Sequence, residues 1–126
     1  IDVRYTGSLT GADLSNVAFY VQNVTDTDAG AGTGQLSGDL DLVVAVHDAG
    51  ETCAANTGPA TTVGTTAPLA AYPTTFAGGV DSGWQPAASG EVRAFELTWA
   101  LGTDTTDGAQ GDSVTVDFVW EANAGV

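Results

Sequence analysis

The stretch ELTWALGTDTTDGAQGDSVTVDFVWEA, residues 96–122, contains the pattern that decides the fold class of this chain. From residue 113 onward polar and apolar side chains alternate, the apolar ones being Val114, Val116, Phe118 and Trp120. Alternation with a period of two is typical of a strand with one buried and one solvated face. The residues before the polar connection alternate in the same way around Trp99. The stretch therefore predicts two strands, and it predicts that Trp99, Val116 and Phe118 lie in the core.

Three further segments, together with an extension of the Trp99 strand back to residue 91, indicate that most of the chain is built from strands. Alternating apolar residues run through residues 1–7, 17–22, 40–48 and 91–101, with clusters of turn-forming residues between them. A strand with one apolar face needs a second sheet to cover that face. With 126 residues, the length is that of a single domain. We therefore predict an all-β fold, an antiparallel β-sandwich, as one domain over residues 1–126.

The segment from about residue 49 to 90 differs from the rest because it is rich in Thr, Ala, Gly and Pro. It is too long for a simple loop in a compact domain. We expect a short strand or helix near Ala67–Ala71 and another strand around Thr74–Ala77. The remainder is expected to form an elaborated loop, which makes this segment a long Thr/Ala/Gly-rich insertion in the sandwich.

The charge of the chain limits its partners. Sixteen acidic residues stand against two basic ones, Arg4 and Arg93, for a net charge of −14. Nucleic-acid binding needs Lys and Arg to neutralise phosphates, so it is not expected. Self-repulsion opposes assembly unless salt or divalent cations screen the charge, or apolar surface is buried. A high-salt habitat and a Ca²⁺-containing cell surface are two compatible interpretations.

Targeting features are few. No run of 18 apolar residues occurs, so membrane insertion is not expected. The chain starts at Ile1 without a Met, which predicts a processed or trimmed N-terminus.

The sequence predicts that the protein is not an enzyme. His47 is the single histidine and there is no lysine, so a Ser-His-Asp or Ser-Lys mechanism would rest on His47 alone. Neither a G-x-S-x-G nor an H-E-x-x-H motif occurs. The glycine-rich residues 30–34 lack the following Lys of a phosphate loop. Cys53 is the only cysteine, which excludes an internal disulfide and predicts a partly buried small apolar side chain.

Two acidic clusters are candidate Ca²⁺ sites. One consists of Asp26 and Asp28, and the other of Asp104 and Asp107 with Asp112 nearby. Both lie in predicted loops, which supply many of the oxygen ligands of Ca²⁺, but neither matches the EF-hand spacing. Chance clustering in so acidic a chain is the alternative, and no other cofactor is expected.

Two other features allow a functional and a structural interpretation. Asn23-Val24-Thr25 is a glycosylation sequon, and a bare asparagine turn is the alternative. Trp84 lies outside the predicted strands, where an exposed ring would suit a carbohydrate-binding or adhesive module. Alternatively, Trp84 closes one end of the sandwich.

The quoted stretch also carries a family resemblance. FELTWAL and AQGDSVTVDFVWEA resemble the C-terminal part of the TasA/camelysin family. IDVRYTG, NVAFYVQNVTD and GQLSGDLDLVVAVHD are similar to the earlier strands of that family, in the same order, and together these segments cover about half of the chain. The resemblance implies a jelly-roll-like sandwich that is secreted and builds extracellular biofilm filaments.

The resemblance further implies how copies of the chain would join. In the family, an N-terminal strand of one subunit completes the sheet of the next, which is strand addition at an open edge. Here Ile1, Val3 and Tyr5 would enter the neighbour's groove, or the donor would lie upstream of Ile1, where the family usually has it. A carbohydrate-binding or adhesive surface module is the rival function. Camelysin is described as a metalloprotease, but no metal motif is present here.

Overall fold

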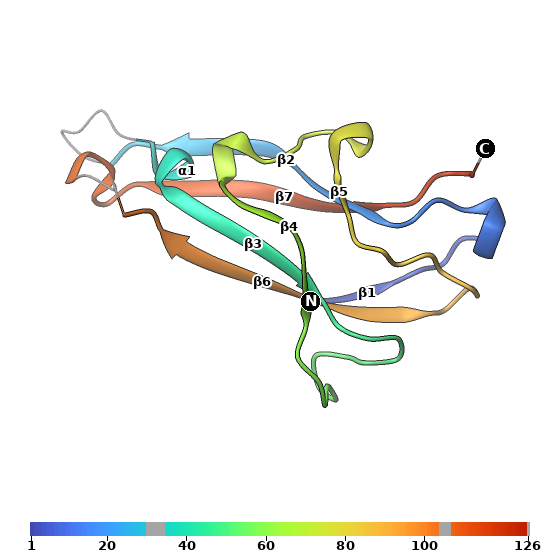
Figure 1. The fold of residues 1–126 in the computed structure, drawn as a ribbon. Coiled ribbons are helices and arrows are strands. Elements are labelled where there is room, and N and C mark those ends of the chain that lie inside the picture. Colours follow the sequence, from blue (N-terminus) through green and yellow to red (C-terminus); the bar gives the residue numbers. More distant parts are fainter. Residues whose placement is uncertain (30–34, 104–106, 126) are drawn as a thin grey trace.

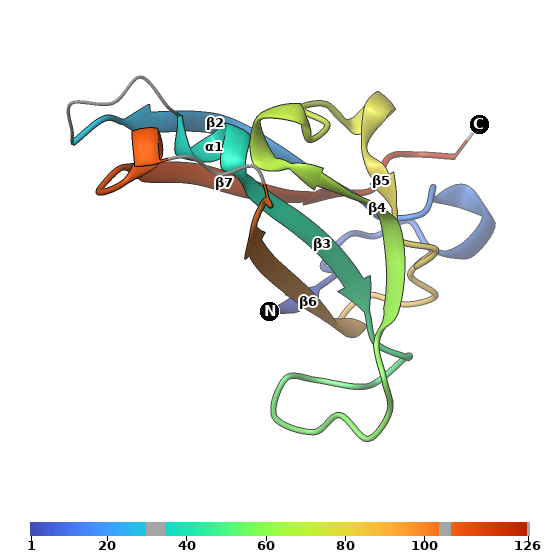
Figure 2. The same ribbon diagram turned by 60° about the vertical axis from the view of Figure 1, so that its left-hand side comes forward.

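Two antiparallel sheets face each other in the computed structural model, which describes residues 1–29, 35–103 and 107–125 (Figures 1 and 2). The first sheet has the order β1 (Asp2–Arg4), β6 (Val92–Leu101), β3 (Leu40–Val46) and β4 (Thr61–Pro68). The second has the order β5 (Val80–Asp81), β2 (Ala18–Thr27) and β7 (Ser113–Glu121). All neighbouring strands pair antiparallel. The all-β antiparallel sandwich is thus confirmed, while its jelly-roll connectivity stays a prediction.

Helical elements within the described ranges are short connectors. They are α1 (Leu36–Asp39) and the 3-10 turns η1 (Gly11–Asp13), η2 (Leu69–Ala71), η3 (Phe76–Gly78) and η4 (Asp107–Ala109). No helix in the described part of the chain has the length and apolar character needed to cross a membrane.

The Thr/Ala/Gly-rich segment contributes to both sheets. Its residues include β4, which pairs with β3, and β5, which pairs with β2. The expectation of a loop was therefore wrong for Thr61–Pro68, and the strand expected at Thr74–Ala77 is replaced by η3. The expected short element near Ala67–Ala71 is confirmed by η2. Alternation is weak in β4 because most of its side chains are threonines exposed at the border of the sheet.

Aromatic rings fill the space between the sheets. Phe19 of β2 is fully buried, and its ring centroid lies 5.9 Å from Tyr72, 5.9 Å from Phe118 and 5.2 Å from Trp120. Phe95 of β6 lies 5.7 Å from Trp120, which links the two sheets. The alternating residues of β2, β6 and β7 thus supply the core, as their pattern predicted.

One end of β6 departs from the core prediction. Val116 and Phe118 are partly buried and pack against the core cluster, so the phase of β7 was correct. Trp99 is 38% exposed and Leu101 is 61% exposed. The prediction that Trp99 lies in the core was wrong, because no described strand covers this border of β6.

Trp84 is buried in the core cluster beside Phe95, which agrees with the structural and not with the carbohydrate-binding interpretation of this residue. It is 1% exposed, and its indole Nε1 donates a hydrogen bond of 2.7 Å to Glu91 Oε1. The Arg93 guanidinium carbon lies 6.0 Å from the centre of the Trp84 ring. The buried ring cannot stack on a sugar at the surface.

Acidification is expected to destabilise the domain through Glu91. The backbone N–H of Ala87 chiefly lowers the pKa of Glu91, helped by the Trp84 indole and the Arg93 charge and opposed by burial. A lowered pKa means that the stabilisation is complete above the ordinary Glu value of 4.5 and is lost as pH falls through the lower folded value. Denaturant unfolding from about pH 6 to about pH 3 should therefore show a smaller loss of stability in Glu91→Gln than in the wild type. Equal losses would contradict this role.

Candidate functional site

The outer edge of β6 is only partly paired. β1 pairs with residues Val92–Ala94, and the main chain of Ile1 exchanges hydrogen bonds of 2.7 and 2.8 Å with that of Phe95. Beyond this pair, no described strand lies on the same edge. Because the main-chain groups of alternate residues point to the same edge, Leu97, Trp99 and Leu101 present unpaired N–H and C=O groups there. The opposite edge of β6 is paired with β3 along its whole length from Phe95 to Leu101.

β7 forms the matching border of the other sheet. It pairs with β2 on one side, and no described strand pairs with its other side. The two borders lie on the same side of the molecule in both ribbon views (Figures 1 and 2). The rings of Trp99 on β6 and Phe118 on β7 are 5.7 Å apart. The sandwich is thus open between β6 and β7.

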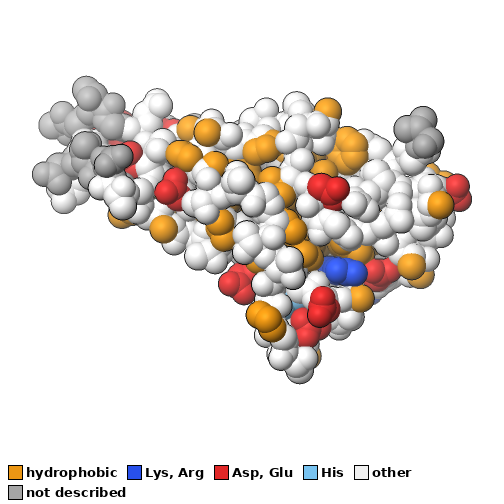
Figure 3. Space-filling model, in the orientation of Figure 1, with side chains coloured by type: hydrophobic (Ala, Val, Ile, Leu, Met, Phe, Trp, Pro, Cys, Tyr) orange, Lys and Arg blue, Asp and Glu red, His pale blue; other side chains and the backbone are white. Residues whose placement is uncertain are grey.

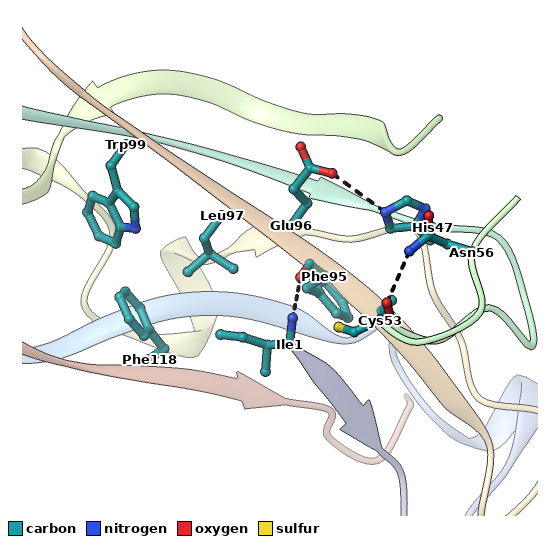
Figure 4. A pocket seen from close by; sticks show the side chains of 10 residues that line it. Ile1, His47, Cys53, Asn56, Phe95, Glu96, Leu97, Trp99 and Phe118 are labelled. Carbon is teal, nitrogen blue, oxygen red and sulfur yellow. Dashed lines mark hydrogen bonds and ion pairs between the residues drawn. The ribbon is translucent and has the colours of Figure 1, made fainter. Parts of the chain in front are cut away.

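A cavity of about 410 Å³ follows this opening around the edge of β6. Figure 4 shows Leu97 and Trp99 directed toward Phe118, with Ile1 beside them. We call the apolar part, lined by Ile1, Phe95, Leu97, Trp99 and Phe118, the β6 groove. The space-filling view shows apolar side chains interspersed with polar ones over the visible face (Figure 3). The combination of an apolar lining with unpaired main-chain groups suits an extended peptide.

The polar end of the cavity contains His47 between two carboxylates. Nδ1 lies 3.3 Å from Glu51 Oε2, and Nε2 lies 3.6 Å from Glu96 Oε2. Cys53 lines the same cavity, but its sulfur points toward Ile1 and away from His47 (Figure 4). Since both imidazole nitrogens face carboxylates, neither is directed at the thiol as a general base. Sequence reasoning missed Glu51 and Glu96 because only the folded chain brings them to His47.

Carboxylates also hold the loop that follows β3. Glu51 Oε1 accepts hydrogen bonds from the backbone N–H and the hydroxyl of Thr57, at 2.9 and 3.0 Å, and these lower the pKa of Glu51. Asp2 Oδ1 accepts a hydrogen bond of 2.7 Å from the Cys53 N–H, which chiefly lowers the pKa of Asp2. The Cys53 side chain is exposed, so its predicted partial burial was wrong.

The acidic clusters have structural partners where they are described. Asp26 Oδ1 accepts a hydrogen bond of 2.8 Å from the Ser37 N–H, and Oδ2 accepts one of 2.6 Å from its hydroxyl. Asp112 Oδ1 accepts a hydrogen bond from the Ala29 N–H. The exposed Asp28 also has an interaction partner. Within the described ranges, no three His, Cys, Asp or Glu side chains are arranged to hold a metal.

The second predicted Ca²⁺ cluster is not covered by these observations. Asp104 and the side chain of Asp107 lie outside the described residues. Their proposed role in binding Ca²⁺ stays a prediction.

Asn23 occupies a bulge in β2. Its φ of 53° lies in the left-handed region, which asparagine tolerates better than most residues. The register between β2 and β7 shifts between Gln22 and Thr25, and the Asn23 amide donates a hydrogen bond of 2.7 Å to Asp117. The bulge accounts for an asparagine at this position. Glycosylation of the exposed Asn23 stays a prediction.

The proposed donor residues lie in a strand of their own domain. Val3 pairs opposite Arg93, and both Val3 and Tyr5 pack against the core cluster. Ile1 lines the β6 groove and is exposed over about half of its surface, at 51%. This arrangement matches the alternative in which the first strand belongs to its own sandwich.

Val3→Asp is expected to destabilise the domain. Val3 packs against the core cluster, so the carboxylate would lose most of its water there, and the Arg93 guanidinium directly opposite would offset only part of that cost. We therefore expect the free energy of unfolding to fall by about 1–2 kcal/mol. Thr6→Asp adds the same charge at an exposed position and serves as the control. Urea unfolding of the two variants checks the difference. Equal stability would mean that β1 is not held against its own core.

Comparisons with known proteins leave the function to be inferred from the chain itself. A scan against protein-family models finds no matching family, and searches of curated proteins and of solved structures find no match.

Proposed function

We propose that this protein is a non-catalytic structural subunit of a secreted extracellular filament or biofilm matrix. Its copies join non-covalently by donor-strand complementation. The observation that carries the proposal is the β6 groove, where exposed apolar side chains adjoin an unpaired sheet edge. An open apolar edge is an aggregation hazard unless a strand covers it. An added strand would pair the free main-chain groups and cover the apolar side chains together.

The donor in this proposal is a strand of a second copy. Ile1, Val3 and Tyr5 contribute if β1 is exchanged, because an exchanged strand makes the same pairs with β6 of the neighbour. Because these pairs end at Phe95, a strand in line with β1 is needed to fill the groove beside Leu97, Trp99 and Leu101, whether β1 is exchanged or stays in its own domain. The resemblance to TasA/camelysin supports both the mode of assembly and the extracellular location.

A carbohydrate-binding or adhesive module is the second candidate. Trp84 is buried and cannot serve it, but Trp99 exposes 38% of its surface beside Phe118. Aromatic faces of this kind stack on sugar rings. If monomers bind soluble oligosaccharides and the Trp99→Ala variant loses this binding, the result would favour this function over a filament.

High salt is expected to promote filament formation. Each subunit carries a net charge of −14, and the Debye length falls from about 10 Å at 0.1 M salt to about 3 Å at 1 M. Screening therefore reduces the repulsion between neighbouring copies. Negative-stain electron microscopy should show unbranched fibres at 1 M salt and few at 0.1 M. Millimolar Ca²⁺ at low salt tests whether the acidic loops add to this effect.

Two outcomes would count against this scheme. If fibres form equally well at low salt in the presence of a chelator, charge screening does not govern their formation. A protein that stays monomeric at micromolar to millimolar concentration and high salt would exclude the filament itself.

A further inference from the structure

We propose that the β6 groove accepts its strand in one orientation and one register, antiparallel to β6 and in line with β1. The strand it accepts has apolar side chains at alternate positions and no carboxylate opposite Glu96. The inference rests on the proposed function only for the source of the strand, a second copy of the chain. Its orientation and pattern follow from the contacts of β1 and β6.

The existing ladder sets the orientation. Ile1 and Phe95 exchange both of their main-chain hydrogen bonds, which defines a hydrogen-bonded pair of an antiparallel ladder. The next such pairs along β6 fall at Leu97, Trp99 and Leu101, each with its N–H and C=O free on the same edge. In an antiparallel strand, one residue satisfies both groups of its partner. A strand in line with β1 therefore extends the ladder without a break.

The same register sets the side-chain pattern. Residues directly opposite each other in a sheet direct their side chains to the same face. Partners of Leu97, Trp99 and Leu101 would therefore face the groove and Phe118 and must be apolar. Partners of the intervening β6 residues would face the other side. A slip of one residue would bury the polar set instead.

Glu96 adds a charge requirement. Its side chain is 59% exposed, on the face opposite the groove, with one carboxylate oxygen near His47. The residue of the incoming strand that lies opposite Glu96 is the one next to Ile1. Like charges directly opposite each other destabilise a sheet. An acidic residue at that position is therefore disfavoured. In a chain with sixteen acidic residues, this requirement excludes many segments from pairing with β6 in this register.

A tethered strand tests the register without requiring filaments. The sequence Val-Thr-Val-Thr-Val-Thr, fused directly before Ile1, places valines opposite Leu101, Trp99 and Leu97 and a threonine opposite Glu96. The control, Thr-Val-Thr-Val-Thr-Val, has the same composition one residue out of phase. We expect the in-phase extension to raise the Tm by about 5 °C or more and to reduce acrylamide quenching of Trp99. The control should change neither quantity.

A second pair of variants tests the charge requirement. Aspartate in place of the threonine opposite Glu96 should remove at least half of the rise in Tm. Glu96→Gln in the same chain should restore it. Failure of that restoration would overturn the role assigned to Glu96.

Filament formation by the in-phase extension separates this inference from the proposed function. If the in-phase extension stabilises the chain and fibres no longer form, the register and the proposed function both hold, because the chain's own added strand occupies the groove that a neighbour would otherwise fill. If it is stabilised and still forms fibres, the register holds but copies join elsewhere. If both extensions stabilise the chain equally, or neither does, the inference is overturned whatever the fibres do.

Discussion

Trp99→Asp is expected to prevent filament formation at concentrations at which the wild type assembles, and to leave a folded monomer. The ring of Trp99 is 38% exposed at the border of β6, so its loss removes few core contacts. The new carboxylate would lie in the β6 groove, where an incoming strand would have to remove its water without offering it a partner. Such burial costs at least the roughly 1–3 kcal/mol of an uncharged polar group, which corresponds to a rise of about 5-fold to 150-fold or more in the concentration needed for assembly.

Thr98→Asp is the matched control for that variant. Thr98 is the preceding residue of β6, is exposed, and lies on the opposite face, so the substitution adds the same charge outside the groove. It should form fibres at nearly the wild-type concentration. Electron microscopy and sedimentation report assembly, and circular dichroism reports folding. Fibres from Trp99→Asp at the wild-type concentration, or failure of both variants, would contradict a joint at the groove.

Phe19→Ala is expected to cause the largest loss of stability, about 3–5 kcal/mol. Phe19 is 0% exposed, and its ring contacts those of Tyr72, Phe118 and Trp120 within 5.9 Å between centroids. Its removal leaves a cavity between the two sheets that rigid aromatic neighbours cannot easily fill. Urea unfolding at neutral pH measures the change.

Two substitutions in β7 calibrate this effect. Phe118→Ala should cost about 2–3 kcal/mol, less than Phe19→Ala, because Phe118 is only partly buried. Thr115→Ala, on the exposed face of the same strand, should change stability by no more than about 0.5 kcal/mol. Equal effects at Phe118 and Thr115 would show that the phase of β7 is wrong.

The alternation of residues 113–121 was enough to predict β7 and the face that it buries. The same local pattern located β2, β3 and β6, because side chains alternate across any strand whatever its neighbours are. The need to cover apolar faces then led to a two-sheet fold. The fold class and the inward face of each of these strands could therefore be inferred from the sequence alone.

The threonine-rich β4 shows one limit of that reasoning. A border strand whose side chains are mostly exposed has little apolar alternation, so it resembled a loop until its pairing with β3 was known. The use of Asp26 to hold Ser37, and the meeting of His47 with Glu51 and Glu96, also depend on contacts between separate segments.

Trp99 shows what only the tertiary structure decided. The alternation of the sequence correctly assigned Trp99 to the inward face of β6, but it did not predict that the side chain is exposed. Periodicity is a local property that identifies a face, whereas burial depends on whether another segment covers that face. Ile1 pairs with Phe95, and beyond it no described strand covers the edge of β6, so an inward-facing tryptophan lies in an open groove.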